Sequence, residues 1–399
     1  MHNQDISIDQ PTPAPPPLGG RVMDGVDLQE ETHQATQAVY VASQWKLMWW
    51  KFRRHKMAMA GLVMVIILYL IAIFAEFLAP SDPNQVNAAY TYAPPQRIQV
   101  VREENGERVY GLHVNGYKSE IDTETMARSF VIDPEVVVPI GFWVKGYEYE
   151  LLGFIPFDRH LFGPKDPSQP FFPLGADRLG QDLLSRMIIG TRISMSIGLI
   201  GVALSLVLGI VIGGISGYFG GGLDTAIQRL IEFLVSIPLI PLWLGLAAAV
   251  PDTWSPLQTY FGITLILSII GWTGLARVVR GRFLSLREEE FVTAARLDGT
   301  GEMRIILHHM LPSFSSHIIA SVTLAIPAVI LAETTLSFLG LGLRSPINSW
   351  GVLLQEAQNI RSVSTAPWLL LPGLMVVIAV ISFNFLGDGL RDAADPYAS

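Results

Sequence analysis

The chain is organised around residues 288–312, EEEFVTAARLDGTGEMRIILHHMLP, a charged stretch with helical periodicity that lies between two long apolar runs. Within it, Phe291, Ala294, Ala295 and Leu297 are spaced as one narrow apolar face of a short helix. The stretch therefore predicts a short amphipathic helix in a loop between two membrane spans.

Two positions after this helix predict where it ends. Gly299 can adopt the left-handed conformation that closes a helix, and Thr300 can then cap a second short helix. Ala294 and Ala295 keep side-chain bulk away from the face that we expect to be exposed, which favours close approach by another protein. The alternative is an ordinary loop helix without a partner.

The composition indicates a membrane protein. Half of the 399 residues are hydrophobic and only 16% are charged, with a mean hydropathy of +0.40, which is too apolar for a soluble domain of this size. The absence of cysteine excludes disulfides and thiolate metal sites. The formal charge of −8 argues against a nucleic-acid partner.

Histidines do not indicate a metal site either. Adjacent His308 and His309 would point to different sides of a helix, which is poor geometry for chelation. We expect these two residues and His317 to serve packing or interface contacts, and we predict no metal ligand.

The first 79 residues divide into two parts. Residues 1–44 include PTPAPPP and few apolar residues, so we predict a disordered cytoplasmic tail. Residues 45–79 begin with WKLMWWKFRRHK, which predicts an interfacial helix, and continue as a first span over 57–79. A signal peptide is the alternative, but the apolar run is too long for one and lies too far from Met1.

Residues 80–187 are polar and carry alternating runs such as RIQVV and YEYELLGF. The pairs Asn105-Gly106, Asn115-Gly116 and Lys145-Gly146 lie between such runs and predict hairpin turns. We therefore expect a β-rich insertion outside the cytoplasm, entered and left on the same side of the membrane.

Five more apolar runs follow, over residues 188–218, 224–250, 257–279, 313–338 and 368–385. Pro238 and Pro241 predict a break in the second of these, and Asp224 is placed to cap its helix. The arginines after residue 276 place residues 288–312 in the cytoplasm. The predicted fold is an all-α polytopic membrane protein with six transmembrane helices, a β-rich insertion between helices 1 and 2, and both termini in the cytoplasm.

Several separate motifs then resemble one family. They are GADRLGQD, SGYFGGGLD, LAETTLSFLGLGL followed by SWG, and NFLGDGLRDAADP. Residues 188–399 resemble the membrane domain of the second permease subunit of ABC importers of the oligopeptide, dipeptide and nickel class, and residues 288–312 resemble its "EAA" coupling loop. Thr293 stands where that family often has Glu.

The resemblance implies which residues meet the ATPase. These are Glu290, Ala294, Ala295, Asp298 and Gly299 in the coupling loop. No Walker-type phosphate loop occurs in the chain, so ATP would be bound by partner subunits, and we predict no catalytic residue and no cofactor here.

The resemblance also implies the partners of the protein and its cellular location. We expect a second homologous permease subunit, two ATP-binding subunits, an extracytoplasmic substrate-binding protein and membrane lipid, in the inner (cytoplasmic) membrane. Oligopeptides or dipeptides are the expected substrates, with oligosaccharides or nickel as the alternative. A proton-coupled secondary transporter and a scaffold protein are two further alternatives.

Two acidic residues within apolar runs are candidates for the pathway or for contact with the partner permease. They are Glu232 and Glu333. The alternative for Glu232 is an ion pair with Arg229, three residues before it.

The insertion itself is rich in tyrosine, at positions 90, 92, 110, 117, 147 and 149. Linkers are polar and flexible, so these residues predict an ordered domain instead. Such a domain would either meet the binding protein or the partner permease, or pack its tyrosines into a small core of its own.

Overall fold

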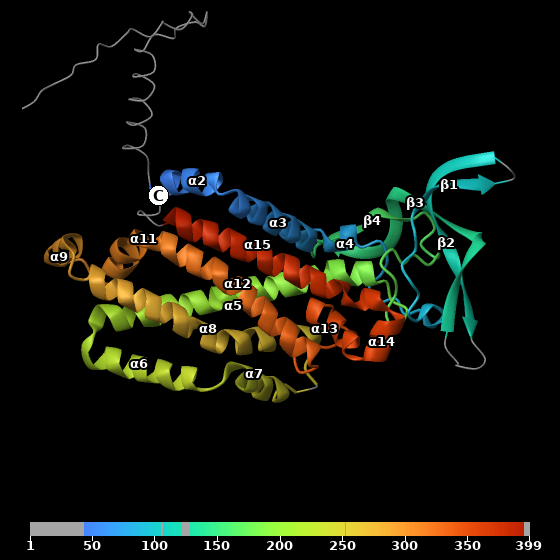
Figure 1. Cartoon of the computed structure of the whole chain (residues 1–399). Helices are drawn as coiled ribbons and strands as arrows, with labels where there is room; N and C mark the ends of the chain where they lie inside the picture. The colour runs from blue at the N-terminus through green and yellow to red at the C-terminus, as the bar shows by residue number, and fades with distance from the viewer. Residues whose placement is uncertain (1–43, 105–106, 122–127, 252, 395–399) are drawn as a thin grey trace, which may run out of the picture. The chain divides into compact units, whose positions relative to one another are not determined.

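The computed structural model describes residues 44–104, 107–121, 128–251 and 253–394 (Figure 1). The chain divides into two units, residues 1–50 and 51–399. In the first unit, the described residues are helical and begin α2 (Gln44–Arg54). The Nζ atom of Lys46 lies 5.1 Å from the centre of the Trp50 ring. The helix predicted at this position is confirmed.

In the second unit, the described residues form five helical segments long and apolar enough to cross a membrane. They are α3 (Lys56–Ile73), α5 (Leu183–Phe219), α8 (Pro256–Leu286), α12 (Ser315–Phe338), and η4 (Pro367–Leu370) with α15 (Leu371–Ala394). A sixth is present if α6 (Gly221–Ser236) and α7 (Leu239–Ala248), which meet at 82°, count as one broken span.

Shorter helices connect these segments. They are α4 (Ala75–Leu78), η1 (Ala88–Tyr90), α9 (Glu290–Leu297), α10 (Glu302–Arg304), the π-helix η2 (Ile305–Met310), α11 (Leu311–Ser313), α13 (Trp350–Gln355), η3 (Glu356–Gln358) and α14 (Ile360–Thr365).

Helix α5 begins five residues earlier than the sequence pattern predicts. Asp182 caps it, because its carboxylate accepts hydrogen bonds from the backbone N–H groups of Leu184 and Ser185. Residues 183–187 are therefore helical and do not belong to the irregular part of the insertion.

The predicted break in the third apolar run is confirmed at one of its two prolines. Pro238 stands between α6 and α7, whereas Pro241 lies in the first turn of α7, where a missing N–H costs no hydrogen bond. The predicted cap was wrong. Gly220 occupies the cap position of α6, and Asp224 instead accepts two 2.6 Å hydrogen bonds from Arg280 of α8.

Helices α5 and α8 lie side by side with their backbones in contact (Figure 1). A Cβ atom at Gly213 would lie 2.8 Å from the Cα of Ala276, and one at Gly217 would lie 2.7 Å from the carbonyl oxygen of Arg280. Only glycine fits at these two positions, as expected for small residues at a helix contact in a membrane.

The β-rich segment between α4 and α5 is an antiparallel sheet with strand order β1-β2-β3-β4. Its strands are β1 (Gln99–Glu104), β2 (Glu107–Ile121), β3 (Arg128–Leu151) and β4 (Ile155–Pro164). The first part of β3 pairs with β2, as far as Pro139, and the rest pairs with β4 from Ile140 onwards. One 24-residue strand thus joins both halves of the sheet.

Two of the three predicted hairpin turns were wrong, and the third, at 105–106, lies outside the described residues. Asn115-Gly116 and Lys145-Gly146 lie inside β2 and β3, at shifts in pairing register. A Cβ atom at Gly116 would lie 2.7 Å from Val136, and one at Gly146 would overlap the ring of His160. These glycines mark irregular strand pairing and close packing, not chain reversal.

Most of the tyrosines pack inside the insertion. Tyr90 and Tyr117 contact Phe130 and Phe172 in one cluster. Tyr147 and Tyr149 contact the ring of His160 in another. Tyr110, in contrast, is 74% exposed. The prediction of an ordered domain is confirmed, with two small aromatic clusters.

Candidate functional site

Helix α9 ends as the sequence predicts. Gly299 has a φ of +73°, its N–H donates to the carbonyl of Arg296, and the N–H of Thr300 donates to the carbonyl of Ala295, each at 3.0 Å. This is the hydrogen-bond pattern of a Schellman motif, in which a left-handed residue closes the helix. Thr300 therefore belongs to the end of α9, and the prediction that it caps the next helix was wrong; Gly301 occupies that cap position.

The inward face of α9 differs from the predicted apolar stripe. Val292 and Ala295 are buried, whereas Phe291 is 41% and Leu297 84% exposed, and Ala294 is exposed as well. Apolar residues occur on both sides of this short helix, so periodicity alone could not select the buried side. Of the two alanines expected at the surface, only Ala294 lies there.

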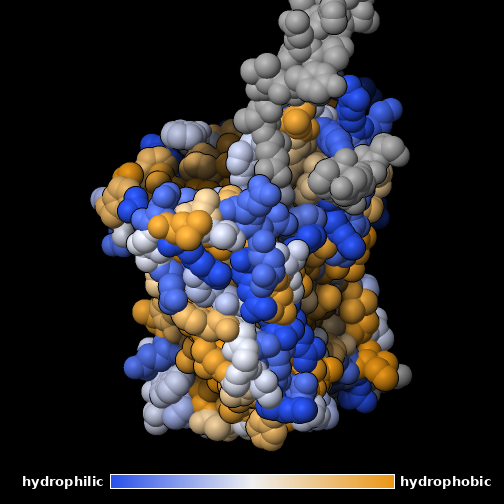
Figure 2. Space-filling model, turned by 90° about the vertical axis from the view of Figure 1, so that its left-hand side faces the viewer, coloured by the Kyte–Doolittle hydropathy of each residue, from blue (hydrophilic) through white to orange (hydrophobic). Residues whose placement is uncertain are grey.

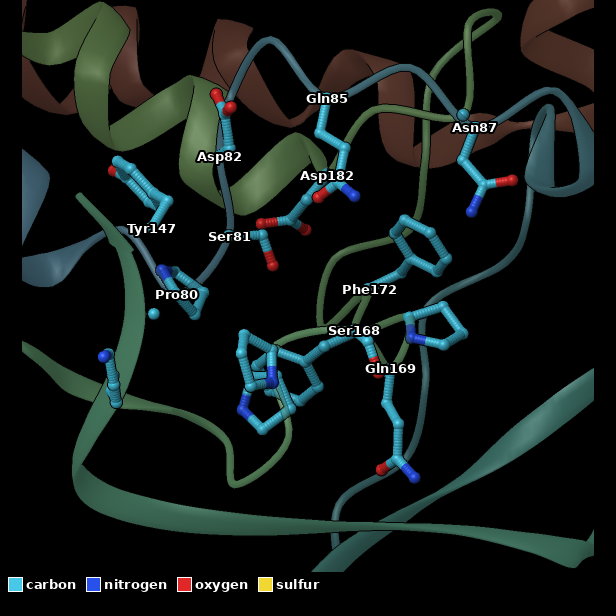
Figure 3. Close-up of a pocket in the computed structure, with 17 residues that line it drawn as sticks. Pro80, Ser81, Asp82, Gln85, Asn87, Tyr147, Ser168, Gln169, Phe172 and Asp182 are labelled. Atoms are coloured by element: carbon cyan, nitrogen blue, oxygen red, sulfur yellow. The ribbon is translucent and has the colours of Figure 1, made fainter. Parts of the chain in front are cut away.

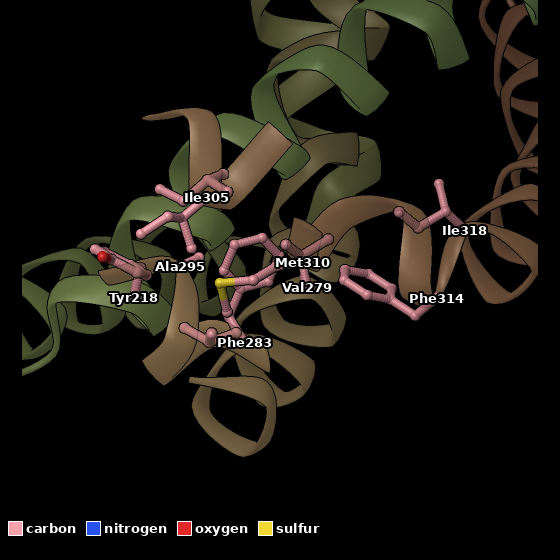
Figure 4. Packing of buried hydrophobic residues seen from close by; sticks show 10 residues of the cluster. Tyr218, Val279, Phe283, Ala295, Ile305, Met310, Phe314 and Ile318 are labelled. Carbon is pink, nitrogen blue, oxygen red and sulfur yellow. The ribbon is translucent and has the colours of Figure 1, made fainter. Parts of the chain in front are cut away.

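Beneath α9 lies a group of buried apolar side chains, here called the loop cluster (Figure 4). It comprises Tyr218, Val279, Phe283, Val292, Ala295, Ile305, Ile306, Met310, Phe314 and Ile318. The Arg296 guanidinium also lies over the Tyr218 ring, 5.1 Å from its centre. The cluster joins α9 to the ends of α5 and α8 and to η2, so the loop is held as a packed unit.

The outward side of α9, here called the docking surface, consists of Glu290, Phe291, Thr293, Ala294, Leu297, Asp298 and Gly299, all of them exposed. Small and apolar side chains such as Ala294 and Leu297 thus lie between the carboxylates of Glu290 and Asp298 on this surface. Figure 2 faces this end of the molecule and shows hydrophobic patches among hydrophilic residues. Four of the five residues predicted for the coupling contact lie on this surface, and Ala295 lies beneath it.

Glu333 is fully buried inside the chain. Its Oε1 atom accepts hydrogen bonds from the hydroxyls of Ser337 at 2.8 Å and Ser349 at 2.7 Å, and its Oε2 atom accepts one from Ser194 at 3.3 Å. These serines belong to α12, to the cap of α13 and to α5. The carboxyl group therefore joins three elements and is closed off from any open pathway in this conformation.

Glu232 lies on the surface of α6. Its carboxylate accepts a 2.6 Å hydrogen bond from Arg229, and 55% of its side chain is exposed. The ion pair considered as an alternative is thus present. The described partners of Glu232 and Glu333 come from different helices, so the structure does not bring these two candidates together.

A buried ion pair that the sequence did not predict lies in the GADRLGQDLLSR segment. Arg186 donates to the Asp177 carboxylate and to the side-chain oxygen of Asn348 at 2.8 Å, while Asp177 also accepts from the N–H groups of Leu179 and Gln181. Both charged residues are at most 5% exposed. The segment is polar and lies before the apolar run at 188, so no local pattern in the sequence marked these two charges as buried.

A polar cavity of about 180 Å³ lies between the loop after α4, the sheet and the start of α5 (Figure 3). Burial raises the pKa of Asp182, which borders it, to about 6. The Tyr147 hydroxyl and the Gln169 side-chain oxygen are buried there without a hydrogen-bond partner among the described residues. At this volume the cavity is smaller than typical small-molecule sites, so it is no route for a peptide.

His308 and His309 lie exposed in η2. Within the described part of the chain, no group of three His, Cys, Asp or Glu residues could hold a metal ion.

Together these features define a polytopic membrane protein with a packed loop helix whose outer face is exposed. Residues 209–398 match the family described as "Binding-protein-dependent transport system inner membrane component". Residues 43–95 match "N-terminal TM domain of oligopeptide transport permease C".

Curated relatives agree with these matches. The oligopeptide transport system permease protein OppC of Haemophilus influenzae is 34% identical over 315 residues, which cover 78% of this chain and 96% of the relative. The dipeptide transport system permease protein DppC of the same organism is 29% identical, covering 87% and 93%. DppC of Bacillus subtilis is 36% identical, covering 56% and 68%.

A chain from the solved inward-facing MetNI methionine ABC transporter matches 53% of this chain and 97% of its own length, at 16% identity and a TM-score of 0.42. That score is too low to support an argument. The curated relatives decide the assignment: the chain belongs to the family of binding-protein-dependent transport system inner membrane components, the permease subunits of ABC importers. It works in a complex with ATPase and binding-protein partners and is not itself the catalytic subunit.

Proposed function

We propose that this permease imports oligopeptides or dipeptides, forming half of the translocation pathway beside a second, homologous permease. The relatives carry this proposal, since they are oligopeptide and dipeptide permeases that this chain matches over most of their lengths. Two ATP-binding subunits would supply the energy, and an extracytoplasmic binding protein would deliver the peptide.

The proposed topology has six spans, with both termini in the cytoplasm and the sheet outside. Basic residues support it, because Lys51, Arg53, Arg54 and Lys56 precede or begin α3, and arginines 277, 280 and 282 lie near the end of α8. The start of α3 and helix α9 lie at one end of the helical body, and the sheet lies at the other (Figure 1).

Single cysteines test this topology cleanly because the chain has none of its own. Ser119→Cys, on an exposed site of β2, should react with a membrane-impermeant maleimide from outside the cell. Thr293→Cys, on the docking surface, should react only after the cytoplasmic face is opened. The reverse pattern would refute the scheme.

The docking surface of α9 is the proposed contact with the ATPase. The observation that carries this proposal is that Ala294 and Leu297 face outward while Val292 and Ala295 hold the helix on the loop cluster. A helix held in this way can transmit a push to α8, which leads directly into it.

Ala294→Trp tests this contact. The bulky ring should prevent docking without touching the loop cluster, so the permease should fold and insert but retain the ATPase subunits at least about tenfold less in co-purification. Peptide uptake in proteoliposomes should fall with it. Val131→Trp, at a 48% exposed site of the sheet, is the control and should behave as wild type. Normal uptake by Ala294→Trp would contradict the proposal.

A further inference from the structure

An apolar groove of about 540 Å³ separates α3 and α4 from the β3–β4 hairpin. Leu70, Phe74 and Phe77 contribute to one wall, and Trp143, Leu151 and Phe157 form the other. Every lining residue is hydrophobic. Its size is that of a site for a small ligand, yet it offers no polar group that could orient a peptide.

The first wall is continuous with a membrane-facing surface. Helix α3 is a candidate span, and Ile67, Leu70 and Phe74 beside the groove are between 40 and 48% exposed. At about 1.5 Å per residue, the helical path from Lys56 to Phe77 is roughly 30 Å long, the thickness of a hydrocarbon core. With Lys56 at the cytoplasmic boundary, the groove lies at the depth of the outer leaflet.

The second wall belongs to a hairpin with two unlike faces. Side chains alternate along a strand, so Leu151 lines the groove whereas Glu148 and Glu150, both exposed, lie on the opposite face. At the turn, Leu152 is 49% and Phe154 72% exposed. Such a hairpin suits the membrane interface, with its apolar side toward lipid and its carboxylates toward water.

The hairpin is fixed in this position by contacts with α4. The ring of Trp143 meets that of Phe77 edge to face at 5.5 Å. The fully buried His160 has its Nδ1 atom 2.9 Å from the carbonyl oxygen of Glu76, whose carboxylate also binds Arg192 of α5. The groove is therefore formed before any ligand enters it.

We infer that the β3–β4 hairpin lies in the outer leaflet of the membrane and that the groove between it and α3 holds an acyl chain of an outer-leaflet phospholipid. This inference rests on the proposed topology, which places the sheet outside the cytoplasm. The insertion thereby gains a second attachment to the membrane beside the ends of α4 and α5.

The first test compares two exposed sites of the sheet. Phe154→Cys in the hairpin turn and Tyr110→Cys on β2 replace side chains that are 72% and 74% exposed. Each is labelled with the fluorophore NBD in the complete complex in nanodiscs whose lipids carry a doxyl group on the acyl chain. At position 154 the fluorescence should be quenched at least twofold and blue-shifted, and at position 110 it should be unchanged.

Equal and weak quenching at both sites would overturn the inference. Shielding of position 154 from aqueous iodide without quenching by doxyl lipid would also overturn it, because a partner subunit would then cover the hairpin. Failure of the topology is a separate result, in which Ser119→Cys reacts only from the cytoplasm.

The second test concerns the groove itself. Phosphatidylglycerol with a diazirine in its acyl chain should cross-link to the groove residues of α3, α4 and the hairpin. Leu151→Trp fills the groove and should reduce this cross-linking severalfold, whereas Leu199→Trp, at a 49% exposed site of α5, should not. Cross-linking that is unchanged by Leu151→Trp would show that no acyl chain occupies the groove.

Discussion

Helix α9 and the sheet end are held by different chemistry, although an Asp224–Arg280 ion pair also joins α6 to α8 at the α9 end. At the α9 end, the loop cluster is apolar and α9 rests on it through Val292 and Ala295. At the sheet end, charged and hydroxyl groups make the joints: Asp177 with Arg186, Glu76 with Arg192, and Glu333 with its serines. Apolar contacts have no preferred direction, whereas hydrogen bonds require particular distances and angles.

This difference indicates that the two ends differ in how easily they move. A loop on an apolar cluster can shift by small amounts while its contacts remain buried. The ion pairs and hydrogen bonds at the sheet end hold α5, α12 and α13 in one position relative to one another. If the ATPase docks on α9 as proposed, the end that meets it is the adaptable one, and the opposite end is the reference against which it moves.

The largest effect is expected from Arg186→Ala at the sheet end. It leaves the Asp177 carboxylate buried without its cation, which should cost about 3–5 kcal/mol of stability. The apparent melting temperature of the purified permease in detergent measures this loss. Arg178→Ala removes an ion pair whose arginine is 59% exposed and should cost less than about 1 kcal/mol. Equal melting temperatures for the two variants would contradict the polar joint described here.

Ile305→Ala in the loop cluster should have the next largest effect. Ile305 is fully buried, so its truncation leaves a cavity that should lower the stability by about 2–4 kcal/mol. We expect the loss to be local, with faster hydrogen exchange in α9 and weaker retention of the ATPase. Leu307→Ala, at a 45% exposed neighbour, should leave exchange in α9 unchanged. Faster exchange in the sheet instead of α9 would show that the two ends are not separate.

Glu333→Gln separates a structural role from a pathway role. The amide retains size but not all hydrogen bonds to Ser337 and Ser349, which should lower stability by about 1–3 kcal/mol. Peptide uptake per folded complex should stay near that of wild type. Lost uptake at unchanged melting temperature would instead assign Glu333 to the pathway.

The last effect is a gradual change of stability with pH. Burial raises the pKa of Asp182 to about 6 from its ordinary value of 3.8, so the folded protein binds more protons than the unfolded chain between these values. The stabilisation that proton binding to Asp182 gives the folded protein is fully present below pH 4 and is lost as the pH rises through 6. At about 1.4 kcal/mol per pKa unit, wild type should lose on the order of 3 kcal/mol over that window. Asp182→Asn, which can still cap α5, should show a flatter profile in melting experiments, and an identical slope would refute the assignment.

The helices followed from the sequence because length and apolar composition are sufficient for a span. Helix α12 begins two residues from its predicted start, at Ser315 instead of 313. Helix α5 was misjudged because its first turn contains Ser185 and Arg186, which bind the backbone of Ser81 and the side chain of Asn348, far away in the sequence.

The candidate sites followed only in part. Glu333 stood out in the sequence as an acidic residue in an apolar run. Its hydrogen bond with Ser194 could not be predicted, because the two residues are 139 positions apart in the sequence. The orientation of α9 depends on what α5 and α8 place beneath it, so the spacing of Ala294 and Ala295 could not decide which of them is buried.

The contact of α5 with α8 through Gly213 and Gly217 has a mechanical consequence. At these two positions the helices touch without side chains between them, so each helix resists bending of the other. Helix α8 runs into α9 across residues 287–289, and the far end of α5 carries Arg186 and Arg192. We therefore expect a force on the docking surface to tilt α5 and α8 together, so that the movement reaches the sheet end and the helices do not bend.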